Sequence, residues 1–524
     1  MKFTSLATRI LFLTIPFSPV FSQVVEFSKE FRLGSPNSEP GGRKDVVLLS
    51  DGDFVALTKV VASAKKNTFA LERYGKNQFE TRWSVEIDAE SNEEFKDLFF
   101  NGKELVLLTV VHLETQAKTV LNAYGYNTET GAKLYAKELE SYTVAAWNEN
   151  IHKGKVKESF IDVICEHTNA PFITPFEYKH HLVFSPDGTK FLSYVFNYGA
   201  SSLTANVNIY DAYGNKLKSG KVGIDNEYVN YGIYINNKAE LFVLNASNGG
   251  KVNFIKFDVD TKDFSIVELP ATSFQKDDFH VRFLSDNKIV VGNTELNYKG
   301  AFSGILYSVF DFESQKVEKS IFQEYNATMK AKHVEARKAI KSIKNEENWL
   351  DYDLVYFNLE QDGRIIFVLE KRSLYADGYP HIARGTFDKS HNQALEGHVQ
   401  AEGIIMFSFN AADELIWTAY HPKNQVYPAS DGLNSISFVL DNMQADQIRI
   451  LYAYSEGFDA SLHNLHYVAF NRDIGEIVND KLLPNPDKLV LVRDYTLWPQ
   501  KDRLVLVGRK GLLGKSSIIA SYKL

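Results

Sequence analysis

The segment from Ser373 to Gly403 holds the densest group of side chains that could do chemistry. Phenol, imidazole and guanidinium groups can hydrogen-bond sugars and peptides or bind anions, and imidazole is also a common metal ligand. The residues that we expect to bind a ligand are Tyr375, Tyr379, His381, Arg384 and His391. The alternative is an exposed polar loop whose histidines simply titrate.

A metal ion is the second chemistry that this segment suggests. His381 could bind one together with His391 or His398, but their spacing matches no zinc template. We therefore predict no metal site and no cofactor.

Catalytic motifs do not fit the rest of the chain. The run Gly508–Ser516 (GRKGLLGKS) ends like a phosphate-binding loop, but Arg509 stands where the template requires glycine, and the residues after Ser516 have the pattern of a strand. We predict a β-hairpin there. No Gly-x-Ser-x-Gly elbow and no His-Glu-x-x-His pair occurs, so the sequence names no catalytic residue.

The elements that must position these residues have the pattern of β-strands. Short runs of β-branched and aromatic residues are separated by turns such as Asp-Gly and Asn-Gly, and a unit of four runs recurs eight times. The first copy extends from Val46 to Ile87, with its first turn at Asp51–Asp53. Eight four-stranded units predict an all-β fold, a β-propeller of eight blades. Seven blades is the alternative, because copies one and eight could be miscounted.

The last copy has three strands, ending with the run Ser517–Leu524. A strand-like segment near the N-terminus, Val24–Leu33, has no place in the first copy. We predict that this segment supplies the outermost strand of the last blade. Such pairing closes the ring and hides the edges of the sheets.

The run His181–Val195 (HLVFSPDGTKFLSYV) contains the turn Phe184-Ser185-Pro186-Asp187-Gly188 before an apolar strand. It resembles the WD40-like, TolB-type propeller repeat, whose hallmark is this turn. The resemblance is strong over about fifteen residues and implies the propeller fold. Members of such families bind proteins, assist envelope processes or carry enzyme sites, so the resemblance implies no single function.

Long segments fall on one face of the predicted ring. The turns from first to second strand and from third to fourth strand are short, and they share what we call the trimmed face. The opposite, elaborated face receives the insertions, which we place near 142–178, 323–349 and 373–403. Loops displayed on a rigid framework often carry binding sites, so we expect the functional surface on the elaborated face.

One insertion contains the pattern of a helix, from Ala327 to Trp349. Met329, Val334, Ile340 and Ile343 lie roughly on one stripe among many lysines. This stripe could bind a partner or a membrane surface, or it could pack on the propeller itself.

The N-terminus has the pattern of a secretory signal. Residues 1–22 combine Lys2 and Arg9 with a short apolar run, so we expect them to be removed and residues 23–524 to form a single propeller domain. No other run is long enough to predict a transmembrane helix. Cys165 is the only cysteine, so no disulfide can form within the chain.

The formal net charge of −8 argues against nucleic acid as a partner, because such binding needs clustered cations. The hypothesis that follows is an exported, monomeric and non-catalytic propeller, found in the periplasm, on the cell surface or outside the cell. It would bind a protein or a cell-envelope polymer through its elaborated face. The alternative is a propeller enzyme, a hydrolase or lyase that acts on polysaccharide.

Overall fold

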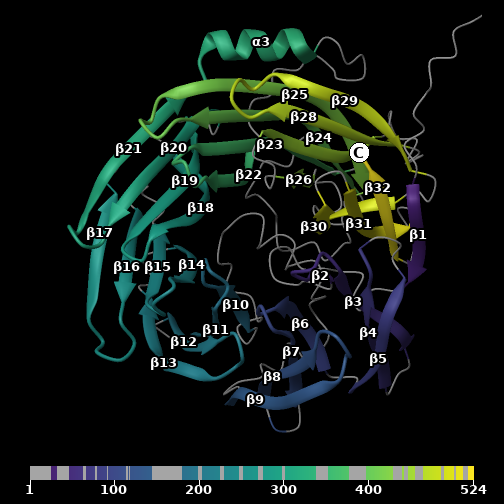
Figure 1. Cartoon of the computed structure of the whole chain (residues 1–524). Helices are drawn as coiled ribbons and strands as arrows, with labels where there is room; N and C mark the ends of the chain where they lie inside the picture. Colours follow the sequence, from purple (N-terminus) through teal and green to yellow (C-terminus); the bar gives the residue numbers. More distant parts are fainter. Residues whose placement is uncertain are drawn as a thin grey trace, which may run out of the picture.

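The computed structural model describes residues 25–31, 46–62, 66–76, 80–90, 93–113, 116, 118–143, 180–198, 203–224, 229–246, 252–269, 275–297, 301–337, 352–376, 397–428, 439–441, 446–454, 464–485, 489–500, 503–510 and 517–524. They form eight four-stranded antiparallel sheets, which stand as blades around a central axis (Figure 1). The chain is an eight-bladed β-propeller. The seven-blade alternative is therefore wrong.

Within each blade the strands are ordered from the axis outward. Blade one holds β2 (Val46–Leu48), β3 (Phe54–Ala62), β4 (Lys66–Tyr74) and β5 (Thr81–Glu90). Blade two holds β6 (Glu93–Phe100), β7 (Glu104–Leu113), β8 (Lys118–Asn127) and β9 (Lys133–Thr143). Blade three holds β10 (His181–Phe184), β11 (Lys190–Tyr198), β12 (Leu203–Asp211) and β13 (Lys216–Ile224). Blade four holds β14 (Val229–Ile235), β15 (Leu241–Ala246), β16 (Val252–Phe257) and β17 (Phe264–Leu269).

The second half of the ring repeats this order. Blade five holds β18 (Gln275–Ser285), β19 (Lys288–Leu296), β20 (Phe302–Asp311) and β21 (Lys316–Glu324), and the helix α3 (Ala327–Arg337) follows it. Blade six holds β22 (Tyr352–Leu359), β23 (Ile365–Ala376), β24 (Gly397–Phe409) and β25 (Leu415–Pro428). Blade seven holds β26 (Val439–Asp441), β27 (Gln447–Tyr454), β28 (Asn464–Asn471) and β29 (Ile477–Pro484). Blade eight holds β30 (Leu489–Gln500), β31 (Arg503–Lys510) and β32 (Ser517–Lys523).

The N-terminal strand β1 (Val25–Phe31) completes blade eight, in the order β1-β32-β31-β30. It pairs antiparallel with β32, so that Lys29 lies opposite Ile519. The predicted closure of the ring is confirmed, and so is the hairpin of β31 and β32 that contains the phosphate-loop-like run.

Burial along each blade explains the strand patterns in the sequence. β20 lies third in its blade, is covered on both faces by the neighbouring blades, and is buried at nearly every position. The outer strand β21 alternates between exposed and half-buried residues along its whole length. A continuous apolar run therefore marks an inner strand, and alternation marks an outer one.

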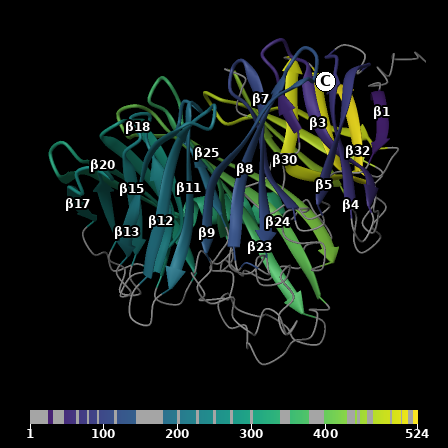
Figure 2. The same ribbon diagram turned by 90° about the horizontal axis from the view of Figure 1, so that it is seen from below.

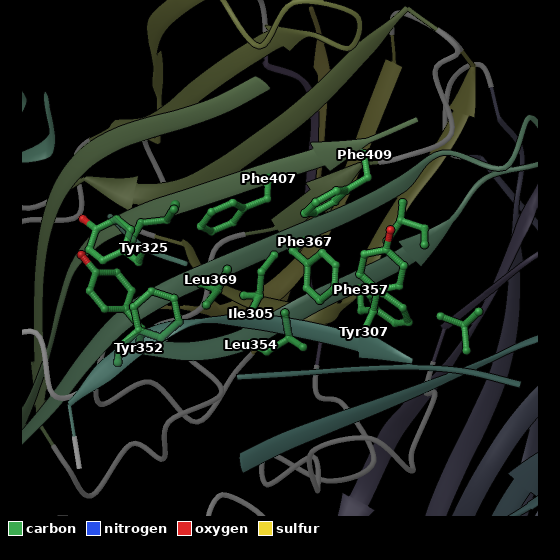
Figure 3. Packing of buried hydrophobic residues seen from close by; sticks show 14 of the residues in the cluster. Ile305, Tyr307, Tyr325, Tyr352, Leu354, Phe357, Phe367, Leu369, Phe407 and Phe409 are labelled. Carbon is green, nitrogen blue, oxygen red and sulfur yellow. The ribbon is translucent and has the colours of Figure 1, made fainter. Parts of the chain in front are cut away.

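Aromatic rings fill the space between blades. Tyr307 of blade five packs edge-on against Phe409 of blade six with ring centroids 5.3 Å apart (Figure 3). Within blade six, Phe357 lies 4.9 Å from Phe367 in the same cluster. Such contacts add to the burial of apolar area. The large share of phenylalanine and tyrosine in the sequence thus has a structural use at the blade interfaces.

The Phe184–Gly188 turn joins β10 to β11 as a tight reversal. Ser185 Oγ donates to Asp187 Oδ1 at 2.7 Å, and the Gly188 amide donates to the Ser185 carbonyl at 2.9 Å. Gly188 has φ = +67°, which glycine adopts without steric cost. The motif works here as a turn of the trimmed face.

Two turns of the trimmed face share the pattern Asn-x-x-x-Gly and a tryptophan from the preceding blade. Trp83 donates its Nε1 hydrogen to the Thr128 carbonyl at 2.8 Å and covers Gly131. In the same way, Trp417 donates to the Arg472 carbonyl at 2.9 Å and covers Gly475. Both glycines have φ = +71°, and a β-carbon on either would lie within 2.7 Å of the indole ring. The trimmed face therefore helps to hold neighbouring blades together.

Side-chain hydrogen bonds join other pairs of neighbouring blades on the trimmed face. Asn101 donates to the Ala212 carbonyl at 3.1 Å, and Asn236 donates to the Asp286 carbonyl at 2.9 Å. Where the chain closes on itself, Arg503 of blade eight donates to the Lys76 carbonyl of blade one at 2.7 Å. These polar groups hydrogen-bond neighbouring blades to each other. The opposite, elaborated face is therefore the better candidate for binding a ligand.

The described helix α3 covers part of the predicted helical segment; residues 338–349 lie outside the described residues. Asn326 caps α3, because its Oδ1 accepts the Met329 amide at 3.0 Å. Met329 and His333 are buried against blades five and six, and the His333 ring stacks on Tyr420 at 4.3 Å. This part of the stripe thus packs on the propeller.

Candidate functional site

Three strands of blade six continue past its innermost strand toward the elaborated face. Its strands β23, β24 and β25 have 12, 13 and 14 residues, whereas the innermost strand β22 has 8. β23 ends low on the loop-bearing side in Figure 2. The last pair of the β23–β24 ladder is Ala376 with Gly397, so the insertion predicted at 373–403 begins and ends within paired strands.

Only one of the predicted ligand-binding residues falls on a described element. Tyr375 lies on β23, with its backbone opposite His398 of β24, at the tip of the extension. Tyr379, His381, Arg384 and His391 lie outside the described residues. Cys165 also lies outside them. The predicted grouping of these side chains stays a prediction.

Two β-bulges mark the root of the extension. The β23–β24 register shifts at Glu402, because Lys371 lies opposite Gly403 while Arg372 lies opposite Ala401. The β24–β25 register shifts beside Lys423, between the pairs Gly403–Pro422 and Ala401–Gln425. A bulge bends the strand and redirects side chains, and here each bulge sends a charged side chain into the protein.

Buried ion pairs result from this redirection. Lys423 Nζ pairs with Glu370 Oε1, and both side chains are fully buried. Lys371 pairs with Glu402, and these side chains are also almost fully buried. Lys423 also donates to Gln425 Oε1 at 2.6 Å. Buried pairs of this kind add little net stability over apolar residues, but they fix the positions of the strands that carry them.

A chain of hydrogen bonds leads from this root into blade seven. His421 Nε2 lies 2.7 Å from the Tyr452 hydroxyl, and that hydroxyl lies 2.6 Å from His466 Nδ1. His466 Nε2 in turn pairs with Asp480 at the outer strand. Burial, with a contribution from His466, lowers the pKa of His421 to about 3, so His421 is neutral at neutral pH. The root of the extension is therefore connected to blade seven through neutral as well as charged groups.

A second polar cluster lies at the root of the insertion between blades two and three. Its centre is Glu140 at the end of β9, which is 6% exposed. Oε1 accepts from Ser193 at 2.5 Å and lies 3.0 Å from His180 Nδ1. Oε2 accepts from Asn208 at 2.5 Å and from the Tyr210 hydroxyl at 2.9 Å. The Glu140 carboxylate of blade two is thus bonded to β11 and β12 of blade three and to His180, which directly precedes β10.

The charge of Glu140 is stabilised in spite of its burial. Burial alone would raise the pKa of Glu140, but hydrogen bonds and the attraction of His180, together with bonds from Ser193 and Tyr210, hold that pKa below its usual value of 4.5. His180 is 3% exposed, and no group of the described chain hydrogen-bonds its buried Nε2. His180 is therefore buried where blades two and three meet.

Sequence reasoning missed these clusters, because their members are far apart along the chain. Glu140 and Tyr210 are separated by 70 positions, and Lys423 and Glu370 by 53. The available signal was a charged residue within an otherwise apolar strand, as with Glu370 in IIFVLEK. Among the residues that the structure describes, no three His, Cys, Asp or Glu side chains converge as a metal site. Within the same residues, no helix has the length and apolar character needed to cross a bilayer.

Comparisons with known proteins find related folds only. No protein-family model matches the chain, and no curated protein matches it. Among solved structures, a Dos1 propeller is 11% identical, with 96% of each chain covered and a TM-score of 0.41. Sqt1 from Saccharomyces cerevisiae is 9% identical, with 94% of this chain and 97% of that chain covered and a TM-score of 0.40. The β-propeller domain of the Trilobed protease from Pyrococcus furiosus is 10% identical, with coverages of 82% and 93% and a TM-score of 0.34. Similarity at this level assigns no activity.

Proposed function

We propose that this chain is an exported, non-catalytic propeller that binds a protein or a cell-envelope polymer through its elaborated face. The observation that carries the proposal is the extension of blade six. Three strands continue beyond the ring, and two buried ion pairs hold their root. Buried charges that add little stability are consistent with selection for a defined position of the extension and of Tyr375 at its tip.

The trimmed face supports the proposal by contrast. Its polar groups and tryptophans bond across blade interfaces, as with Trp83 and Trp417. As part of this proposal we assign the chain to the WD40-like, TolB-type repeat proteins, on the basis of its Phe184–Gly188 turn. Export rests on the signal-like residues 1–22, and N-terminal sequencing of protein recovered from the cell envelope or medium tests it.

Replacing residues 377–396 by an Asn-Gly turn tests the binding proposal. The cut joins the paired residues Ala376 and Gly397, so the β23–β24 ladder stays intact and the variant should fold. We expect binding to envelope proteins or polymers to fall at least tenfold. In a full-length variant with Tyr379, His381, Arg384 and His391 changed to alanine, binding should fall by a similar factor. Unchanged binding by both folded variants would refute the proposal.

The second candidate is a polysaccharide hydrolase or lyase. One observation favours it: a buried carboxylate orients His180, whose Nε2 has no hydrogen-bond partner in the described part of the chain. A histidine held in this way has the orientation of a general base, but its Nε2 is buried, so a substrate would reach it only after the surrounding side chains move. Turnover of a glycan by the native chain that is lost in His180→Gln would favour the enzyme over the binding protein.

A further inference from the structure

The hydrogen-bond chain between blades six and seven places one hydroxyl group between two imidazole rings. The Tyr452 hydroxyl of β27 lies 2.7 Å from His421 Nε2 and 2.6 Å from His466 Nδ1. His421 belongs to β25 of blade six, and His466 belongs to β28 of blade seven (Figure 1). A hydroxyl group has a single hydrogen, so Tyr452 can donate to one of these nitrogens and must accept from the other.

Asp480 determines the direction of this chain. His466 Nε2 pairs with the Asp480 carboxylate, which only accepts, so Nε2 carries a hydrogen and Nδ1 of the neutral ring is bare. Tyr452 then donates to His466 Nδ1, and His421 donates from Nε2 to the Tyr452 oxygen. With His466 neutral, each bond of the chain therefore donates toward Asp480 at the outer strand β29.

Protonation of His466 reverses two of these bonds. Both nitrogens of an imidazolium ring donate, so His466 Nδ1 now donates to the Tyr452 oxygen. Tyr452 turns its hydrogen toward His421 Nε2, which must be bare to accept it, and the neutral His421 ring then carries its hydrogen on Nδ1. The chain gains one proton in total, because His466 now holds two ring hydrogens while Tyr452 and His421 still hold one each.

Burial keeps the added charge at the outer end of the chain. His421 and Tyr452 are buried, whereas Asp480, which faces His466 from β29, is exposed. Burial lowers the pKa of His421 to about 3, so this ring stays neutral over the range in which imidazole ordinarily titrates, about pH 5–8. The other charged groups here are Lys423, whose Nζ lies 5.2 Å from the Tyr452 ring centroid, and Glu370, which pairs with Lys423.

We propose that His466, Tyr452 and His421 form a pH-sensitive switch, in which proton uptake by His466 moves the hydrogen of His421 from Nε2 to Nδ1. His421 stands two residues before Lys423 on β25, and Lys423 holds the root of the blade-six extension through its pair with Glu370. A proton bound near the outer strand of blade seven thus changes the hydrogen bonds at this root. The switch does not depend on what the extension binds.

¹⁵N NMR of the full chain, labelled in its histidines, tests the switch, because the shift of a ring nitrogen reports whether it carries a hydrogen. His421→Gln and His466→Gln assign the two rings. Tyr452→Phe keeps the aromatic ring but removes the hydroxyl that connects the histidines. Tyr467→Phe is the matched control, because Tyr467 is a buried tyrosine on β28 that packs in the cluster between blades seven and eight. Spectra are recorded from about pH 8 to about pH 5.

At the upper pH we expect His421 to carry its hydrogen on Nε2. As His466 takes up its proton, the Nε2 and Nδ1 shifts of His421 should exchange their character with the same midpoint, and Tyr467→Phe should behave in the same way. In Tyr452→Phe, His466 should titrate while the tautomer of His421 stays constant. If Tyr452→Phe does not fold, His466→Gln decides, because His421 should then keep one tautomer throughout.

Three results would overturn the switch. The first is a His466 ring that takes up no proton in this range, and the second is a His421 hydrogen that stays on Nε2 while His466 titrates. The third is an exchange of the His421 tautomer that persists in Tyr452→Phe or in His466→Gln.

Discussion

Replacing Glu140 by glutamine should weaken the contact between blades two and three and so lower the free energy of unfolding. The carboxylate lies within 3.0 Å of four side-chain groups of blade three, two at each oxygen. Glutamine keeps the shape of the side chain but has one acceptor oxygen, so its amide N–H₂ faces groups that now donate. The change therefore tests the hydrogen bonds rather than the packing.

The cost follows from the number of bonds that are lost. A hydrogen bond to a charged group contributes roughly 1.5–3 kcal/mol, and about two such bonds disappear in Glu140→Gln. Ser193 can rotate its hydroxyl to accept from the amide, which recovers part of the loss. We expect a decrease of about 2–4 kcal/mol in the free energy of unfolding at pH 7.

The pH dependence of this decrease has a defined sign. The pKa of Glu140 is lower in the folded chain than its usual value of 4.5, so its stabilisation is complete above that value. It is lost as the pH falls through the folded pKa, and glutamine does not titrate. The difference between the native chain and Glu140→Gln should therefore shrink below about pH 4.

Guanidinium unfolding followed by tryptophan fluorescence, at pH 7 and at acid pH, measures both effects. Glu138→Gln is the control, because Glu138 is on the same strand and makes an exposed 3.8 Å contact with Lys118. It should cost no more than about 0.5 kcal/mol. Equal costs for the two variants, or a cost for Glu140→Gln that does not change with pH, would refute the reasoning.

Further predictions concern the trimmed face and the closure of the ring. Gly475→Ala should lower stability by about 2–4 kcal/mol, because a β-carbon meets the Trp417 ring at 2.6 Å in addition to the positive φ. Gly188→Ala, where φ is also positive but no atom lies within 4 Å, should cost only about 1 kcal/mol; equal denaturation midpoints would contradict the role of the indole. Lys29→Pro should remove ladder bonds between β1 and β32 and lower the Tm, with aggregation visible by size-exclusion chromatography. An unchanged Tm and elution volume would show that β1 does not close the ring. The 377–396 replacement should leave the Tm within about 2 °C of native.

The sequence predicted the ring because its signals are local. Each tight turn, such as Asp51–Asp53, lies between two strand-like runs. A continuous apolar run indicates an inner strand, and an alternating run indicates an outer strand. The closure was also predictable, since Val24–Leu33 needed a partner and blade eight needed a strand. Local signals repeated eight times give the blade number even without a family match.

The candidate sites were less predictable, because they depend on contacts between blades. Glu140 acquires its surroundings from strands that are distant in the sequence. The length of blade six was hidden as well: Pro422 and Lys423 interrupt the strand pattern, yet the bulges accommodate them within continuous strands. The spacing of apolar residues alone does not reveal a bulge that turns a charged side chain inward to form a buried ion pair.

The central claim is that this propeller binds its partner through the elaborated face. A photo-crosslinking amino acid at Tyr379, compared with one at Tyr213, tests it most directly, because Tyr213 is an exposed tyrosine in a turn of the trimmed face. In envelope extracts we predict discrete adducts from position 379 and none from position 213. Adducts from position 213 alone would contradict the account.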